Sequence, residues 1–144
     1  MKAPSRRFVQ IADALRETNA WTNNEWLCKP GLVDAEKLLL VRANMNPFHC
    51  HPFHYHPNRE EIIYVVYGRA EQWVGEEHRI LRAGEIAHIP PGTVHATYNP
   101  HAEPLVFLAI LSPAEAPGPD PVDVSTEEPW RSLRKGMVEC KTLA

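Results

Sequence analysis

The fold of this chain is indicated most clearly by residues 84–99, which read GEIAHIPPGTVHATYN. This stretch holds two short apolar runs, Ile86 to Ile89 and Val94 to Tyr98, separated by a Pro-Pro-Gly turn. Short apolar runs bounded by glycine and proline are typical of β-strands. The stretch therefore predicts two strands joined by a turn, and it places His95 in the second of them.

The same pattern of short apolar runs extends outward in both directions. The further runs are Leu38 to Val41, Ile62 to Tyr67, Ala70 to Val74, Arg79 to Leu81 and Leu105 to Leu111. Gly75-Glu76-Glu77 separates two of them and predicts a hairpin turn. No helical pattern intervenes, and 14 prolines in 144 residues argue against a helical bundle. We therefore predict an all-β domain over residues 37–111.

Residues 1–36 are predicted to form an N-terminal arm outside this domain. Phe8, Ile11 and Leu15 recur at roughly helical spacing after Ser5, a residue type that commonly caps helices. We expect a short N-terminal helix that packs on the outside of the core.

Residues 112–144 are predicted to form a proline-rich C-terminal tail. Four prolines and a glycine between residues 113 and 121 cannot form a strand ladder and rarely form a helix, so the tail is expected to be extended up to residue 129. Beyond it, Trp130, Leu133 and Met137 lie at helical spacing. They predict a short terminal helix that docks on the barrel or on a second subunit.

Residues 49–61 read HCHPFHYHPNREE and are the densest set of potential metal donors in the chain. Side chains two positions apart on an extended strand point to the same face, so His54 and His56 would present two imidazoles side by side. Imidazole binds Zn, Fe, Ni, Cu and Mn in varying degree, and Glu61 can add a carboxylate oxygen. With His95 as a further donor, the two stretches predict one metal site.

The stretch from residue 84 resembles the second sequence motif of the cupin family, G-x5-P-x-G-x2-H-x3-N. The matching residues are Gly84, Pro90, Gly92, His95 and Asn99. If each fixed residue occurs at about 5%, five such matches arise by chance on the order of once in a few million start points. The resemblance is therefore specific.

The first cupin motif, G-x5-H-x-H-x(3 or 4)-E-x6-G, lies upstream. The matching residues are His54, His56, Glu61 and Gly68. Phe48 stands at the position of the leading glycine, and phenylalanine does not tolerate a positive φ as glycine does. Glu60 is an alternative to Glu61, but only Glu61 leaves six residues before Gly68.

The resemblance implies a double-stranded β-helix, or jelly roll, that holds one divalent ion of Fe, Mn, Ni or Zn. The implied ligands are His54, His56, Glu61 and His95. Four protein donors leave one or two positions for water, substrate or O2. We rank first a dioxygenase-type enzyme acting on a small oxygen-rich metabolite that chelates the metal. A metal-dependent isomerase or lyase is the next alternative, and a non-catalytic cupin that binds a small molecule or a sugar is the third.

The motifs do not assign a role to the neighbouring His49 and His51. By strand parity they share a face opposite to that of the two motif histidines, unless Pro52 forces a bulge. They would then line the mouth of the pocket or a subunit interface, and a second metal site is the alternative. Cys50 is expected to be a small apolar core residue.

The sequence argues against several classes of partner and indicates a cellular location. A net charge of −3 gives no electrostatic reason to expect nucleic acid or an anionic membrane surface. The sequence has no apolar signal segment and no run long enough to span a bilayer. The odd number of cysteines, Cys28, Cys50 and Cys140, favours reduced thiols and a cytoplasmic location. We expect a homodimer, the commonest closed assembly.

Overall fold

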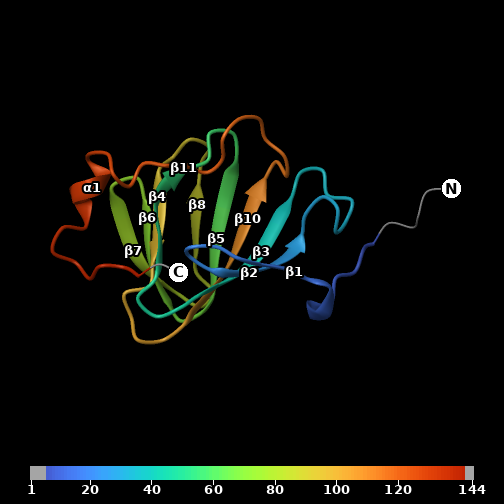
Figure 1. The fold of residues 1–144 in the computed structure, drawn as a ribbon, viewed down its shortest axis with the longest axis horizontal. Coiled ribbons are helices and arrows are strands. Elements are labelled where there is room, and N and C mark those ends of the chain that lie inside the picture. The colour runs from blue at the N-terminus through green and yellow to red at the C-terminus, as the bar shows by residue number, and fades with distance from the viewer. Residues whose placement is uncertain (1–5, 142–144) are drawn as a thin grey trace.

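The computed structural model of the chain describes residues 6–141, which form two antiparallel β-sheets (Figure 1). In spatial order, the six-stranded sheet contains β1 (Leu15–Thr18), β2 (Asn23–Cys28), β3 (Leu39–Met45), β10 (Leu105–Ser112), β5 (Glu60–Tyr67) and β8 (Ile86–Ile89). The five-stranded sheet contains β11 (Val122–Asp123), β4 (Cys50–Tyr55), β9 (His95–Tyr98), β6 (Arg69–Val74) and β7 (Glu77–Arg82). The all-β prediction is confirmed, and the arrangement is a jelly roll.

The inner face of the six-stranded sheet is apolar because its central strands alternate strictly. Buried and partly exposed side chains follow one another along β3 and β10. The two strands pair with Leu111 opposite Leu39 and Ala109 opposite Val41, so their buried side chains form continuous rows. These rows make up one wall of the interior.

The five-stranded sheet divides its two faces differently. His95 and Thr97 of β9 face the interior, while Ala96 and Tyr98 face the opposite way and pack in a second apolar cluster with Phe53. The C-terminal segment covers this outer face, where Trp130 and Leu133 join the cluster. The predicted terminal helix is present as the short α1 (Trp130–Leu133).

The N-terminal arm differs from the prediction. The expected helix is reduced to a single 3-10 turn, Ile11–Asp13, and Leu15 begins β1 instead. β1 pairs with β2, and β2 pairs with β3, so residues 15–28 extend the six-stranded sheet. Pairing with a strand of the barrel outweighs the weak helical spacing of the arm.

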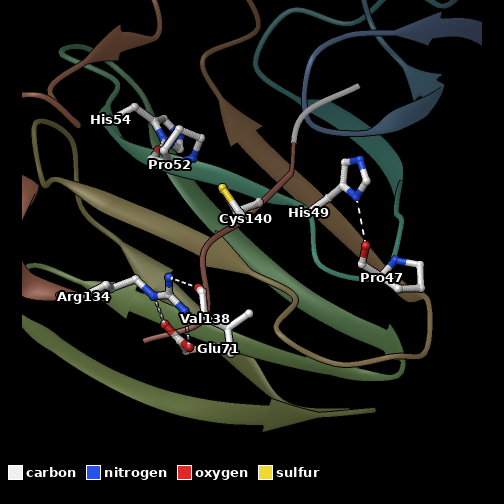
Figure 2. Close-up of a disulfide and its surroundings, with 9 residues drawn as sticks. Pro47, His49, Pro52, His54, Glu71, Arg134, Val138 and Cys140 are labelled. Atoms are coloured by element: carbon white, nitrogen blue, oxygen red, sulfur yellow. Dashed lines mark hydrogen bonds and ion pairs between the residues drawn. A yellow bond between two sulfur atoms is a disulfide. The ribbon is translucent and has the colours of Figure 1, made fainter. Parts of the chain in front are cut away.

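The end of the chain is fastened to the outer face of the five-stranded sheet (Figure 2). The buried Arg134 guanidinium donates to both carboxylate oxygens of Glu71, at 2.5 and 2.9 Å, and lies 3.8 Å from the ring centroid of Tyr98. Cys140 forms a disulfide with Cys50, and the Lys141 amide donates to the Phe48 carbonyl at 2.6 Å. The C-terminal segment is thus an integral part of the fold.

The prediction of three reduced cysteines is wrong for Cys50 and Cys140. Their separation of 90 residues conceals the contact in the sequence, but the last residues run beside the start of β4 and bring the two Cα atoms within 5.6 Å. Within residues 6–141, Cys28 is the free thiol. None of the helices in this range is long and apolar enough to cross a membrane.

Candidate metal centre

Three histidines meet inside the barrel, two from neighbouring strands and one from the residue that follows β4. His54 of β4 stands directly opposite His95 of β9, and His56 follows at the end of β4. One ring nitrogen of each lies within 4.8 Å of the others. The three residues are 2 to 8% exposed, so the cluster is shielded from bulk water.

The ring orientation of each histidine is fixed by a hydrogen bond from its Nδ1 atom. Nδ1 of His54 donates to the Pro52 carbonyl at 2.6 Å, and Nδ1 of His95 donates to the Thr93 carbonyl at 2.9 Å. Carbonyl oxygens only accept, so a neutral ring carries its lone pair on Nε2. Burial, together with His51 and His95, keeps the pKa of His54 well below its usual value. These rings are therefore prepared to bind a metal through Nε2.

Glu61 brings a carboxylate to the same point from the opposite sheet. Its Oε1 atom lies 2.9 Å from Nε2 of His95 and 3.3 Å from Nε2 of His56. Burial raises the pKa of Glu61, but the close polar contacts and charge interactions with the two rings outweigh it and lower the pKa to about 2.

The contact between Glu61 and His95 lacks the geometry of a hydrogen bond. Oε1 of Glu61 and Nε2 of His95 are both buried without a hydrogen-bond partner among the described residues. A buried polar atom without a partner destabilises the fold by about 1 to 3 kcal/mol. A divalent cation would satisfy both atoms at once, so the donor set fits a metal ion. The alternative residue Glu60 points outward and pairs with His88 at 2.6 Å.

His56 receives its support from a residue that the sequence analysis missed. Its Nδ1 atom donates to Oδ1 of Asp120 at 2.5 Å, across 64 residues of sequence. Burial lowers the pKa of His56, but Glu61 and Asp120 outweigh it and raise the pKa above its usual value. Carboxylates that hold a metal-binding imidazole in this way orient it and increase its basicity.

Asp120 is itself held by Arg59. Nη1 of Arg59 donates to the second oxygen of Asp120, while its Nε and Nη2 atoms donate to the carbonyls of Pro113 and Ala114 at 3.0 and 2.9 Å. The arginine thus ties the proline-rich tail to the loop that follows β4. No pattern in the sequence distinguishes Asp120 from the other acidic residues of the tail.

A bulge in β4 determines where His51 lies. His51 pairs with Thr97 and His54 pairs with His95, so β4 has one more residue than β9 between these pairs. Pro52 falls in this interval, and proline cannot donate to the ladder. As a result, His51 lines the same cavity as His54, and the two rings stack with centroids 3.6 Å apart. The strand-parity argument allowed for this position of His51 if Pro52 forces a bulge.

His49 and Phe48 lie at the beginning of β4. The His49 ring hydrogen-bonds to the Pro47 carbonyl at 3.0 Å, away from the metal cluster (Figure 2). Phe48 has φ 61° and is the one residue other than glycine with a positive φ between residues 6 and 141. The phenylalanine therefore adopts the backbone conformation of the motif's glycine, and the bend into β4 is kept.

A cavity of about 640 Å³ adjoins the histidine cluster. The cluster and Glu61 line it at one place, and Trp21 lines it next to His51, with ring centroids 4.0 Å apart. Aliphatic side chains of β3, β5 and β10 line another part of the wall, among them Val41, Ile63 and Ala109. This combination of apolar walls and a few convergent polar groups is typical of sites for small molecules.

Comparison with known proteins agrees with this architecture. Residues 41–111 match the family model of the cupin domain. The sequence finds no match among curated proteins. A Klebsiella pneumoniae protein with a double-stranded β-helix domain is similar at 24% identity and a TM-score of 0.65, over 82% of this chain and 98% of that chain.

Two further solved structures share the fold. An RmlC-like cupin from Shewanella frigidimarina is 20% identical with a TM-score of 0.67, over 77% of this chain and 94% of that one. The oxalate decarboxylase of Lactobacillus farciminis, in a formate complex, is 20% identical with a TM-score of 0.73. That match covers 86% of this chain but 37% of the decarboxylase, so the likeness concerns one part of a longer protein. At these identities the likenesses show the fold.

Proposed function

Because this chain is a small cupin with a metal-binding site inside its barrel, we propose that it is a metal-dependent enzyme acting on a small oxygen-rich metabolite. The observation that carries the proposal is the pair of buried atoms without partners, Oε1 of Glu61 and Nε2 of His95, beside a cavity large enough for a substrate. The proposed ligands are His54, His56, Glu61 and His95. The bound ion would supply Lewis acidity or, as iron, redox chemistry.

The remaining residues of the cavity would position the substrate and exclude water. The Nδ1 hydrogen bonds of the three histidines hold the rings in place before an ion arrives, which reduces the reorganisation that binding requires. The aliphatic wall opposite them keeps the local dielectric low, which strengthens polar interactions with the substrate.

Within this class we rank oxygen-dependent oxidation of the dioxygenase type first. Four protein donors would leave one or two coordination positions for substrate or O2. The wall formed by Val41, Ile63 and Ala109 carries no group that could transfer a proton. Oxidation by O2 depends less than isomerisation or elimination on a side chain that transfers a proton.

A specific observation favours the second candidate, a metal-dependent isomerase or lyase. The His51 ring lines the cavity beside His54, and an imidazole can both accept and donate a proton. The fold likeness to an oxalate decarboxylase, whose name describes removal of a carboxyl group, is compatible with this class.

The test compares turnover with and without O2. The purified chain is loaded with Fe2+, Mn2+ or Zn2+ and given a panel of 2-oxo acids, catechols and dicarboxylates, with His95→Ala as the control. We expect substrate loss coupled to O2 uptake for the Fe2+ form and none for the variant. Turnover that persists without O2 would support the second candidate. Metal-dependent binding without turnover of any compound would contradict the enzyme hypothesis and support a binding protein.

The homodimer and the cytoplasmic location remain proposals from the sequence. Sedimentation as a monomer at every concentration would contradict the first. The Cys50–Cys140 disulfide weighs against the second, because disulfides persist mainly in oxidising compartments. Thiol labelling of the protein in lysates prepared under acid quench would decide whether the bond forms in the cell.

A further inference from the structure

The cavity wall formed by the six-stranded sheet changes in chemistry from strand to strand. β5 contributes Glu61, beside the histidine cluster. β10 and β3, the next two strands, contribute only apolar side chains to the cavity. β2 and β1, beyond them, contribute Asn24, Trp26 and Glu17. The wall thus runs from a metal-binding end through an apolar band to a polar rim.

The strand register shows that these parts are connected diagonally across the sheet. Ile63 pairs with Ala109, Ala109 with Val41, and Val41 with Trp26, which gives one row across four strands. Neighbouring strands lie about 4.8 Å apart, so the apolar band of two strands is roughly 10 Å wide. Glu61 pairs with Leu111, two positions to one side of this row, and Asn24 pairs with Ala43, two positions to the other side. A compound that reaches from Glu61 to the polar rim must therefore carry an apolar segment longer than this width.

The polar rim is organised around a carboxylate. Oε1 of Glu17 accepts hydrogen bonds from Nδ2 of Asn24 at 3.1 Å and from the Trp26 indole at 3.4 Å. Oδ1 of Asn24 in turn accepts from the hydroxyl of Thr22 at 2.9 Å. Lys29 also lines the cavity near this rim, with its Nζ atom 5.1 Å from the centroid of the Trp26 ring. At its own position the fixed Glu17 carboxylate favours a hydrogen-bond donor or a cation.

We propose, building on the proposed function, that the substrate is a chelating acid or phenol with an aryl or alkyl body and a hydrogen-bond donor at its far end. The chelating oxygens face the histidine cluster, the apolar body lies along β10 and β3, and the donor faces Glu17. Oxalate, with two carboxylates on one carbon–carbon bond, would leave the apolar band and the rim unfilled. The cavity therefore selects a larger, partly apolar metabolite.

Simple hydroxamates test this assignment without knowledge of the reaction. Binding to the full chain loaded with Zn2+ is measured by calorimetry for acetohydroxamate, for benzohydroxamate, and for two biphenyl hydroxamates that carry an amino or a carboxy group at the far para position, called the 4-amino and 4-carboxy compounds. Burial of the phenyl ring predicts that benzohydroxamate binds at least about tenfold tighter than acetohydroxamate. The 4-amino compound is expected to bind tighter than the 4-carboxy compound. Metal content is measured after each titration to exclude removal of the ion.

Two variants separate the apolar band from the rim. Ala109→Phe fills the band and should abolish the preference for the phenyl ring while leaving acetohydroxamate affinity within about twofold. Leu108→Phe, on the outward face of the same strand, is the matched control and should keep the preference. Glu17→Gln, on an exposed position of β1, should reduce the discrimination between the amino and carboxy compounds, and it does not depend on tolerance of a larger core residue.

The outcomes distinguish this inference from the function on which it rests. If acetohydroxamate binds the Zn2+ form as tightly as benzohydroxamate, or if Glu17→Gln leaves the 4-amino and 4-carboxy affinities unchanged, the substrate class is wrong while the metal site stands. If no hydroxamate binds the Zn2+ form, the metal is not accessible to substrate, and the proposed function fails together with the inference.

Discussion

The histidines of the metal cluster are supported in two different ways. His54 and His95 donate to carbonyl oxygens two residues upstream in their own segments, Pro52 and Thr93. His56 donates to Asp120, which lies 64 residues downstream in the proline-rich tail. The first kind of support forms wherever the local backbone is correct, whereas the second forms only when the tail has folded against the barrel. The geometry of His56 is therefore coupled to the C-terminal half of the molecule.

Removal of one of the metal ligands is expected to have the largest effect on metal binding. His95→Ala deletes a buried donor and leaves Glu61 facing a void, so we expect loss of stoichiometric metal, a larger effect than the roughly 100-fold upper figure for a supporting residue. Metal content by plasma mass spectrometry after dialysis measures it. Retention of one equivalent of metal in the variant would show that the cluster is not the binding site.

Anchoring of the tail is tested next by Arg134→Met. The variant leaves the Glu71 carboxylate buried with one remaining partner, the Trp73 indole at 2.6 Å, and loss of one member of a buried ion pair destabilises by about 3 to 5 kcal/mol. Urea unfolding measures the change. Arg131→Met removes an exposed ion pair between Glu128 and α1, the helix that Arg134 follows, and is expected to leave stability almost unchanged. Equal effects of the two variants would contradict the role of Arg134.

Asp120→Asn removes the remote support of His56 and keeps the shape of the side chain. The charge that orients the imidazole is lost, so metal affinity should fall by about 10- to 100-fold while the folded structure remains. Competition with a fluorescent chelator measures the affinity. Glu127→Gln, which removes a charge from an exposed part of the same tail outside the cavity, should leave it unchanged. An affinity equal to wild type in Asp120→Asn would mean that local support alone suffices.

The smallest expected effect concerns the local backbone at Phe48. At φ 61° a non-glycine residue is disfavoured by roughly 1 to 2 kcal/mol, and glycine is not. Phe48→Gly should therefore be about 1 kcal/mol more stable than Phe48→Ala, because both variants remove the same ring. Thermal unfolding of the two proteins side by side is the measurement. The opposite order would show that the backbone at this position relaxes when the ring is removed.

The parts of the molecule that depend on local pattern could be predicted from the sequence. The strands around residues 84–99 follow from their apolar runs, and the meeting of His54, His56 and His95 follows from two motifs with fixed spacing. The position of His51 was predictable only as an alternative, because parity cannot decide whether Pro52 forms a bulge.

What depends on contacts between distant segments could not be predicted. Asp120 is one acidic residue among several in a tail without periodicity, and its pairing with His56 exists only after docking. The strands β1 and β2 have too weak an alternation to stand out before β3 is present to pair with them. The contact of Cys50 with Cys140 is likewise a product of the completed fold.

The histidines and the apolar band of the cavity come from different sheets, and this separation affects how the protein can evolve. The three histidines come from the five-stranded sheet and the segment after β4, while the apolar band comes from β3 and β10 of the other sheet. A mutation in the band can alter which molecules fit without touching an imidazole. Descendants of such a chain can exchange one substrate for another while inheriting the ion unchanged, and a laboratory library confined to β3 and β10 would sample the same route.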